Sequence, residues 1–209
     1  MSISTTPAPA RTDDQATTSI STKTVRRTGW AVAFGAALWS ATYFAFNPQS
    51  TDSTEMTIID VGALPAQFAL LALVTVQLRT GATGVTRAAR AMLRVEMVLL
   101  SLATLWTVLH GLVPSFRDDL WLAILDVFWP LSMLGMLVIG VKIAFAGRWQ
   151  GLARWYPLIA ESWVFITLPA MGIFGITVGR FVGATHLLVG YAALGVLLAL
   201  RPQLTGARD

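Results

Sequence analysis

The sequence contains no cysteine and little charge, and both shortages restrict the class of protein. Without cysteine, disulfides, thiolate metal sites, iron–sulfur clusters and cysteine nucleophiles are excluded. Only 12% of the 209 residues are charged, whereas 55% are hydrophobic. Soluble proteins carry about twice that share of charge, because their surface faces water. The composition therefore argues against a soluble enzyme and favours a chain whose surface faces lipid.

The first 25 residues have almost no large apolar side chains and are rich in serine, threonine, proline and alanine. Such a segment cannot bury enough surface to offset its loss of conformational entropy. It also lacks the order of a secretory signal, in which an apolar core directly follows the charged region. We predict a disordered cytoplasmic tail over residues 1–25, a transmembrane domain over residues 26–201 and a short cytoplasmic tail over residues 202–209.

Six apolar runs follow the tail, and each is long enough to cross the hydrocarbon core of a membrane, which needs about 20 residues. Backbone groups inside lipid must be hydrogen-bonded within their own segment, so the runs are predicted to be helices. Glycine or proline separates successive runs, and Gly179 with Arg180 separates the last two. The sequence therefore predicts an all-α, polytopic membrane bundle of six transmembrane helices, at residues 29–46, 58–78, 95–113, 120–141, 157–178 and 181–200.

Lysine and arginine are distributed unevenly between the connections. Thirteen of the fifteen lie on the side of the two termini, and only Arg117 and Arg180 lie on the other side. Basic residues favour the cytoplasmic side, so both termini are predicted to be cytoplasmic, in the cell membrane. Because topology explains the positive charge, no nucleic-acid partner is expected. One helical face presents three arginines to the cytoplasmic surface, where anionic lipid headgroups are the expected partners: Arg87, Arg90 and Arg94.

Spans two and four share a spacing of characteristic residues. In each, an aspartate is followed by a proline within five residues, a glycine 21 residues on, and then an arginine and a glutamate. The shared pattern predicts that spans two–three are repeated as spans four–five, in parallel orientation. Convergence is the alternative, since loop glycines and cytoplasmic arginines are common in membrane proteins. The matched aspartates and glutamates are Asp60 with Asp126 and Glu96 with Glu161.

Charged side chains inside membrane spans are costly, so each one is a functional candidate. Four lie near the outer ends of four different helices, and two glutamates lie near the inner ends of spans three and five. We predict that the outer group converges around one polar pocket that opens toward the outer leaflet. The outer group consists of Asp60, His110, Asp126 and His186.

Each candidate also has a structural interpretation. Asp60 could occupy the first turn of its helix, where the helix dipole favours a carboxylate. Glu96 and Glu161 could pair with Arg94 and Arg154 at the interface. The two histidines could be hydrogen-bonded core residues, or could bracket a haem or bind a metal ion, although neither arrangement has motif spacing. We therefore assign no metal site and no cofactor.

Tryptophan is abundant, with eight residues, and four of them lie well inside the spans, where they could line a pocket or face lipid. We assign Trp106 and Trp129 to ligand binding, together with the outer group. The favoured function is a non-catalytic bundle that binds a lipid-like ligand or a membrane partner, with a protein partner or a homo-oligomer left open. One alternative is an enzyme on a lipid or isoprenoid substrate, with Asp126, Glu96 or Glu161 as general acid. Another is a small proton-coupled transporter, which would need a polar site near the midplane.

Overall fold

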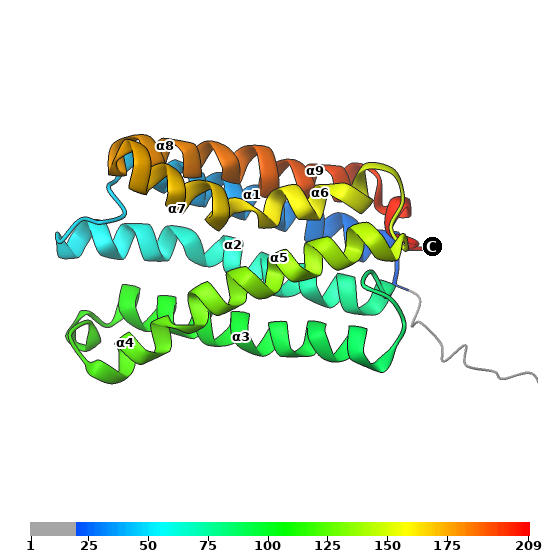
Figure 1. Ribbon diagram of the computed structural model, residues 1–209, viewed down its shortest axis with the longest axis horizontal. Coiled ribbons are helices and arrows are strands. Elements are labelled where there is room, and N and C mark those ends of the chain that lie inside the picture. Colours follow the sequence, from blue (N-terminus) through cyan, green and yellow to red (C-terminus); the bar gives the residue numbers. More distant parts are fainter. Residues whose placement is uncertain (1–19) are drawn as a thin grey trace, which may run out of the picture.

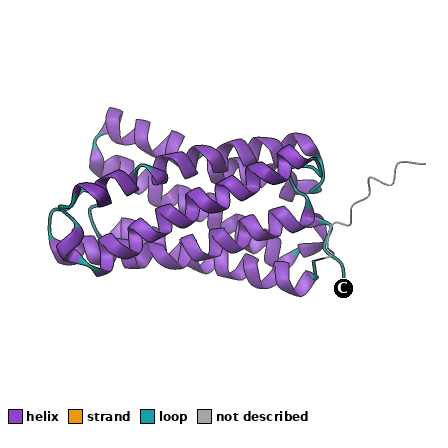
Figure 2. Cartoon of the chain, turned by 90° about the horizontal axis from the view of Figure 1, so that it is seen from below, coloured by secondary structure: helices purple, strands orange, loops and turns teal. Residues whose placement is uncertain are grey.

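The computed structural model describes residues 20–209, and every regular element in that part of the chain is helical (Figures 1 and 2). Residues 1–19 of the tail predicted over residues 1–25 lie outside the described residues. The first helix begins within the remainder of the predicted tail, because Ser21 caps it by accepting a hydrogen bond from the backbone N–H of Thr24. The first three helices are α1 (Thr22–Ala45), α2 (Ser53–Thr80) and α3 (Arg87–Leu112).

Each of the last three helical segments consists of two helical pieces in series. The fourth combines α4 (Leu120–Asp126) with α5 (Phe128–Ala146), and the fifth combines α6 (Gly151–Glu161) with α7 (Trp163–Phe174). The sixth combines α8 (Ile176–Leu187) with α9 (Ala193–Leu200) through one π-helical turn, Leu188–Ala192. Short 3₁₀ turns, Pro114–Phe116 and Pro202–Thr205, complete the chain.

A proline explains the break between α4 and α5. Pro130 has no backbone N–H, so it cannot bond to the carbonyl group four residues earlier, that of Asp126. The helix accordingly stops at Asp126 and restarts at Phe128. Sequence chemistry thus places a carboxylate at an interruption inside a segment that is long and apolar enough to cross a membrane.

Two of the predicted turns use glycine in the left-handed conformation, at Gly81 and Gly147, with φ values of 61° and 63°. The predicted break at Gly179 with Arg180 is wrong. The chain reverses instead at Gly175, whose φ is 83°, and Gly179 lies inside α8. Gly179 packs directly against Met171 of α7, so its missing side chain permits a close helix contact and does not form a turn.

Within residues 20–209, five helical segments are long and apolar enough to cross a membrane: 53–80, 87–112, 120–146, 151–174 and 176–200. This is compatible with an integral, multi-pass membrane protein. Helix α1 has 24 residues, or about 36 Å at 1.5 Å per residue, but it is rich in glycine, alanine, serine and threonine and is less apolar than the other five. The number of six spans is therefore not confirmed.

The six helical segments form a closed ring in which each packs against its neighbours in the chain and α1 also packs against α8 and α9 (Figure 1). The interior holds fully buried aliphatic side chains such as Leu73, Met136 and Leu194. Large apolar side chains are also exposed on the outside, including Phe34, Phe145 and Ile173, each about 70% exposed. An outer surface of this kind is typical of a protein that faces lipid.

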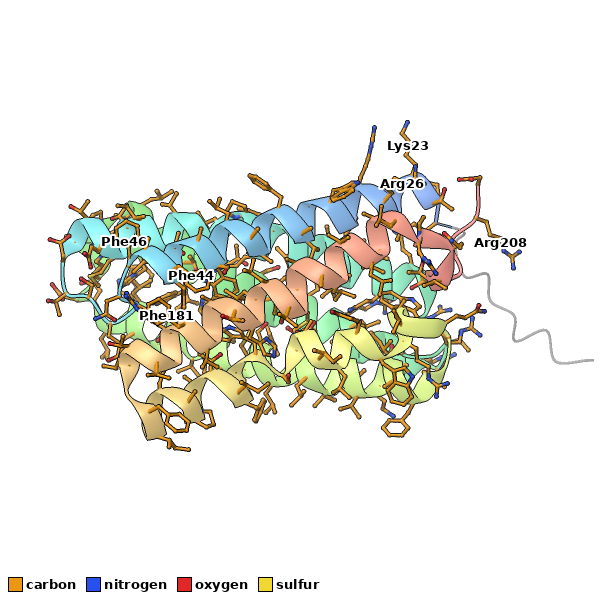
Figure 3. All side chains as sticks on the ribbon, turned by 90° about the horizontal axis from the view of Figure 1, so that it is seen from above. Lys23, Arg26, Phe44, Phe46, Phe181 and Arg208 are labelled. Carbon is orange, nitrogen blue, oxygen red and sulfur yellow. The ribbon has the colours of Figure 1, made fainter. Side chains whose placement is uncertain are left out.

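The two ends of the described chain meet at one end of the bundle, which we call the proximal end. The backbone N–H of Arg208 donates to the carbonyl oxygen of Ile20 at 3.2 Å, and Thr22 hydrogen-bonds Asp209. Lys23, Arg26 and Arg208 lie at this end, whereas Phe44, Phe46 and Phe181 lie at the opposite, distal end (Figure 3). Twelve of the fourteen lysines and arginines of residues 20–209 belong to the proximal half.

Candidate functional site

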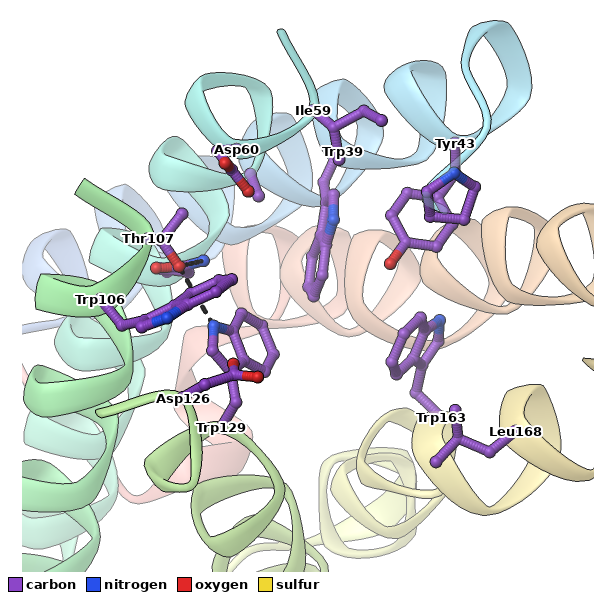
Figure 4. A pocket seen from close by; sticks show the side chains of 13 residues that line it. Trp39, Tyr43, Ile59, Asp60, Trp106, Thr107, Asp126, Trp129, Trp163 and Leu168 are labelled. Atoms are coloured by element: carbon purple, nitrogen blue, oxygen red, sulfur yellow. Dashed lines mark hydrogen bonds between the residues drawn. The ribbon is translucent and has the colours of Figure 1, made fainter. Parts of the chain in front are cut away.

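A cavity of about 400 Å³ lies in the distal half of the bundle, between α1, α2, α3, the α4–α5 break and α7 (Figure 4). This volume falls within the range of about 300–1,000 Å³ that is usual for small-molecule sites. Aromatic and polar side chains alternate around the cavity. Its main lining residues are Trp39, Tyr43, Asp60, Ala63, Gln67, Trp106, Thr107, Asp126, Trp129, Trp163 and Leu168.

An array of aromatic rings forms one wall of the cavity (Figure 4). The ring of Trp39 lies 5.7 Å from that of Trp129 and 5.6 Å from that of Trp163, measured between centroids. Tyr43 lies 6.0 Å from both Trp39 and Trp163. Rings at these separations are in contact, and such pairs contribute roughly 0.5–1.5 kcal/mol beyond their area. The wall is therefore a pre-formed surface contributed by α1, α5 and α7.

Hydrogen bonds to the surrounding helices hold the indole groups in place. Trp129 Nε1 donates to the hydroxyl oxygen of Thr107 at 3.1 Å, and Trp163 Nε1 donates to the carbonyl oxygen of Gly183 at 2.9 Å. Gln67 Nε2 also donates to Thr107 at 2.9 Å. The other amide atom of Gln67, Oε1, is buried and has no partner among the described residues. Gln67 thus borders the cavity with its amide held by Thr107 and its carbonyl oxygen enclosed among the surrounding side chains.

Asp60 and His110 form a bonded pair at the edge of the cavity. His110 Nδ1 lies 2.6 Å from Asp60 Oδ2, and the imidazole stacks on Trp106 with centroids 4.5 Å apart. Gly111 permits this approach, since a Cβ built on it would lie 2.8 Å from the Cβ of Asp60. The first-turn interpretation of Asp60 is wrong, because α2 begins at Ser53 and Asp52 caps it. Asp60 thus links α2 to α3.

Asp126 lies at the cavity opening, at the end of α4. Its side chain is exposed, and it accepts no hydrogen bond and forms no ion pair within residues 20–209. It shares the cavity with Asp60, and His110 is bonded to Asp60 at the cavity edge. These three side chains belong to α4, α2 and α3.

His186 does not join them. Its Nε2 lies 3.2 Å from the hydroxyl oxygen of Ser162, at the α6–α7 break, and its Nδ1 is buried without a partner in the described chain. The predicted convergence of all four outer residues is therefore wrong for His186. The two histidines have separate partners, and in residues 20–209 no three histidine, aspartate or glutamate side chains form a group that could hold a metal ion.

Glu96 and Glu161 lie away from the distal cavity, and both are buried. Glu96 accepts a hydrogen bond from Ser132 at 2.6 Å, and Glu161 accepts one from Tyr191. Neither forms an ion pair in the described chain, so the predicted arginine pairing is wrong; Arg154 donates to the carbonyl oxygen of Ala144 at 2.6 Å. Of the three candidate general acids, only Asp126 lines the cavity.

Glu161 lies farther from the end of its segment than predicted. It is the eleventh of the 24 residues of Gly151–Phe174, so it lies near the middle of that segment. Glu96 lines a second, more apolar groove of about 340 Å³ between α3 and α5, where Gly135 leaves room for its carboxylate.

The assignment to ligand binding omitted several cavity residues, chiefly Trp39, Tyr43, Gln67, Thr107 and Trp163. Helical spacing carries a signal for some of them. Trp39 and Tyr43 are four residues apart on α1, and Asp60 and Gln67 are seven apart on α2, so each pair shares a helix face.

No family model matches the chain, and no curated protein or solved structure matches it significantly.

Proposed function

We propose that this chain is a six-span membrane protein that binds a small amphipathic ligand in the distal cavity and does not catalyse a reaction. The observation that carries this proposal is the cavity itself, which combines a pre-formed aromatic wall with two carboxylates. Sites for small molecules are mostly apolar and contain a few polar groups that orient the ligand.

The packing of α1 supports its role as a sixth span. Gly29 of α1 lies against Gly195 and Ala199 of α9, and Gly35 lies against Ala66 of α2. Membrane helices use small residues in this way to bring their backbones close together. A helix enclosed by two apolar spans needs fewer large apolar side chains of its own, because less of its surface faces lipid.

The charge distribution supports a cytoplasmic location for both termini. The proximal half holds twelve basic residues, whereas the distal half holds Arg117 and Arg180. This orientation places the cavity in the outer half of the membrane. It also places the arginine face formed by Arg87, Arg90 and Arg94 at the inner surface, where anionic lipid headgroups are its proposed partners.

The repeat of spans two–three as four–five is supported by the contacts of the two glutamates. Glu96 in the third crossing accepts from a hydroxyl of the fourth, Ser132, and Glu161 in the fifth accepts from a hydroxyl of the sixth, Tyr191. Each copy thus bonds to the crossing that follows it. Double-mutant cycles on the two pairs, read by thermal unfolding, should give coupling energies of the same sign, and a coupling in only one pair would contradict the repeat.

The ligand proposal is tested by identifying the molecules that co-purify with the protein. Ala63 lines the cavity and is buried, so Ala63→Phe should fill the space. Ala41 is exposed on α1, so Ala41→Phe is the matched control. Mass spectrometry of extracts should show a compound with wild type and Ala41→Phe that is absent from Ala63→Phe. Identical extracts from all three proteins would contradict the proposal, and chemical conversion of the compound by wild type would favour the enzyme alternative.

A proton-coupled transporter is the second candidate, because one buried polar pair lies at mid-membrane depth. Trp39 lines both the distal cavity and a smaller void beside Tyr191, which bonds Glu161. The ligand site and a buried carboxyl group are thus neighbours across one indole ring. If the protein transports its ligand, Glu161→Gln should abolish uptake into proteoliposomes and retain binding. Unchanged uptake in Glu161→Gln would reject a role for this carboxyl group.

A further inference from the structure

The lining of the distal cavity contains acidic side chains and no lysine or arginine. Two of the lining residues are aspartates, and the free amide atom of Gln67 is its carbonyl oxygen. The amide group of Gln67 is held in this orientation by the hydrogen bond from Nε2 to Thr107.

The two aspartates differ in their bonded partners. His110 is bonded to Asp60 at 2.6 Å. Asp126 has no ionic partner among residues 20–209, and it lies where the cavity opens. An anionic ligand would meet two carboxylates and no basic side chain in the lining. A cation is therefore the charged ligand that fits, with Asp126 as its counter-ion.

The aromatic wall fits the same kind of ligand. Cations are attracted to the faces of aromatic rings, most strongly to indole, and quaternary ammonium groups are bound in this way by clusters of aromatic side chains. Here three indoles and one phenol ring adjoin one cavity beside a free carboxylate (Figure 4). An inorganic cation would gain less from these apolar walls than an alkylated one, because it would lose its hydration without filling the space.

We infer that the ligand is a small organic ammonium ion, whose alkylated nitrogen lies against Trp39, Trp129 and Trp163, with Asp126 as counter-ion. This inference rests on the proposed function and adds the chemical class of the ligand. The ammonium group can belong to a free solute or to a lipid headgroup.

Choline and its uncharged analogue 3,3-dimethylbutan-1-ol test the charge directly, because they share size, shape and hydroxyl group and differ in the nitrogen. Each is titrated into the full-length protein in dodecyl maltoside, with tryptophan fluorescence as the readout. Choline should bind about tenfold more tightly, the ratio expected for one partly desolvated cation–π contact. Equal binding of both compounds would overturn the inference and leave the proposed ligand site intact. Binding of neither would overturn both.

Variants assign the effect to the cavity. Asp126→Asn should reduce the preference for choline to less than about threefold and leave the affinity for the neutral analogue unchanged. Asp118→Asn is the matched control, since Asp118 is exposed nearby and does not line the cavity; its preference should equal that of wild type. Loss of preference in Asp118→Asn alone would overturn the inference, because it would place the cation elsewhere.

The source of the ammonium group is found by repeating the choline titration in nanodiscs of phosphatidylcholine. If lipid headgroups occupy the cavity, the choline response should disappear in these nanodiscs while it persists in detergent. If the ligand is a free solute, the response should be the same in both. A choline response in neither environment would overturn the inference.

Discussion

The close contact between α1 and α9 provides a quantitative prediction. A Cβ built on Gly29 would lie 2.5 Å from the backbone nitrogen of Ala199 and 2.6 Å from the carbonyl oxygen of Gly195, and real Cβ contacts essentially never fall below 3.0 Å. These are backbone atoms, so the two helices must separate to accommodate a methyl group. Overpacking of this kind costs roughly 1–3 kcal/mol. Alanine recovers about 1 kcal/mol over glycine inside a helix.

Gly29→Ala should therefore lose up to about 2 kcal/mol of stability on balance, which corresponds to a Tm up to about 8 °C lower for a chain of this size. Gly172 in α7 is the control, because a Cβ there meets no atom within 4 Å and Gly172→Ala keeps only the helical gain. Its Tm should rise by about 1–4 °C. Thermal unfolding in detergent, followed by size-exclusion chromatography, measures both. If Gly29→Ala is as stable as Gly172→Ala, then α1 does not lie against α9, and the argument for a sixth span fails.

Two further predictions concern topology and the distal cavity. A cysteine introduced at the exposed Ser115 should react with an impermeant thiol reagent in intact cells. A cysteine at the exposed Ala88 should react only after the cells are permeabilised. The reverse pattern would show that the chain has the opposite orientation in the membrane. Asp60→Leu should lower the free energy of unfolding by about 1–3 kcal/mol, because it removes the hydrogen-bond acceptor for His110. Asp60→Asn should lower it by less, since the amide oxygen of asparagine can still accept. Equal losses in the two variants would show that this hydrogen bond contributes little to stability.

The helical segments and most turns could be predicted from the sequence, because they depend on local chemistry. Gly81 and Gly147 end helices in the left-handed conformation, as loop glycines usually do. Gly179 shows the limit of this reasoning, since glycine in a membrane protein serves both in turns and in close packing. Its contact with Met171 depends on the partner helix, and the sequence of α8 alone does not contain that information.

The candidate site could be predicted only in part, for a related reason. Helical spacing predicts how far along their helices Asp60, Asp126 and His186 lie. Which of these side chains face one another depends on the order of the helices around the ring. His186 has the expected depth and faces Ser162, whereas Asp60 and Asp126 face one cavity. The unpartnered oxygen of Gln67 could not be foreseen, because it follows from the three-dimensional hydrogen bonds of Thr107.

The most direct test of the proposed ligand site is an experimental density map of the protein, extracted gently and reconstituted in lipid nanodiscs. We expect non-protein density of small-molecule size between Trp39, Trp129 and Trp163, with Asp126 at its open side. A cavity closed by repacked indole rings, or density of the same strength in the Ala63→Phe protein, would contradict the claim that this cavity binds a ligand.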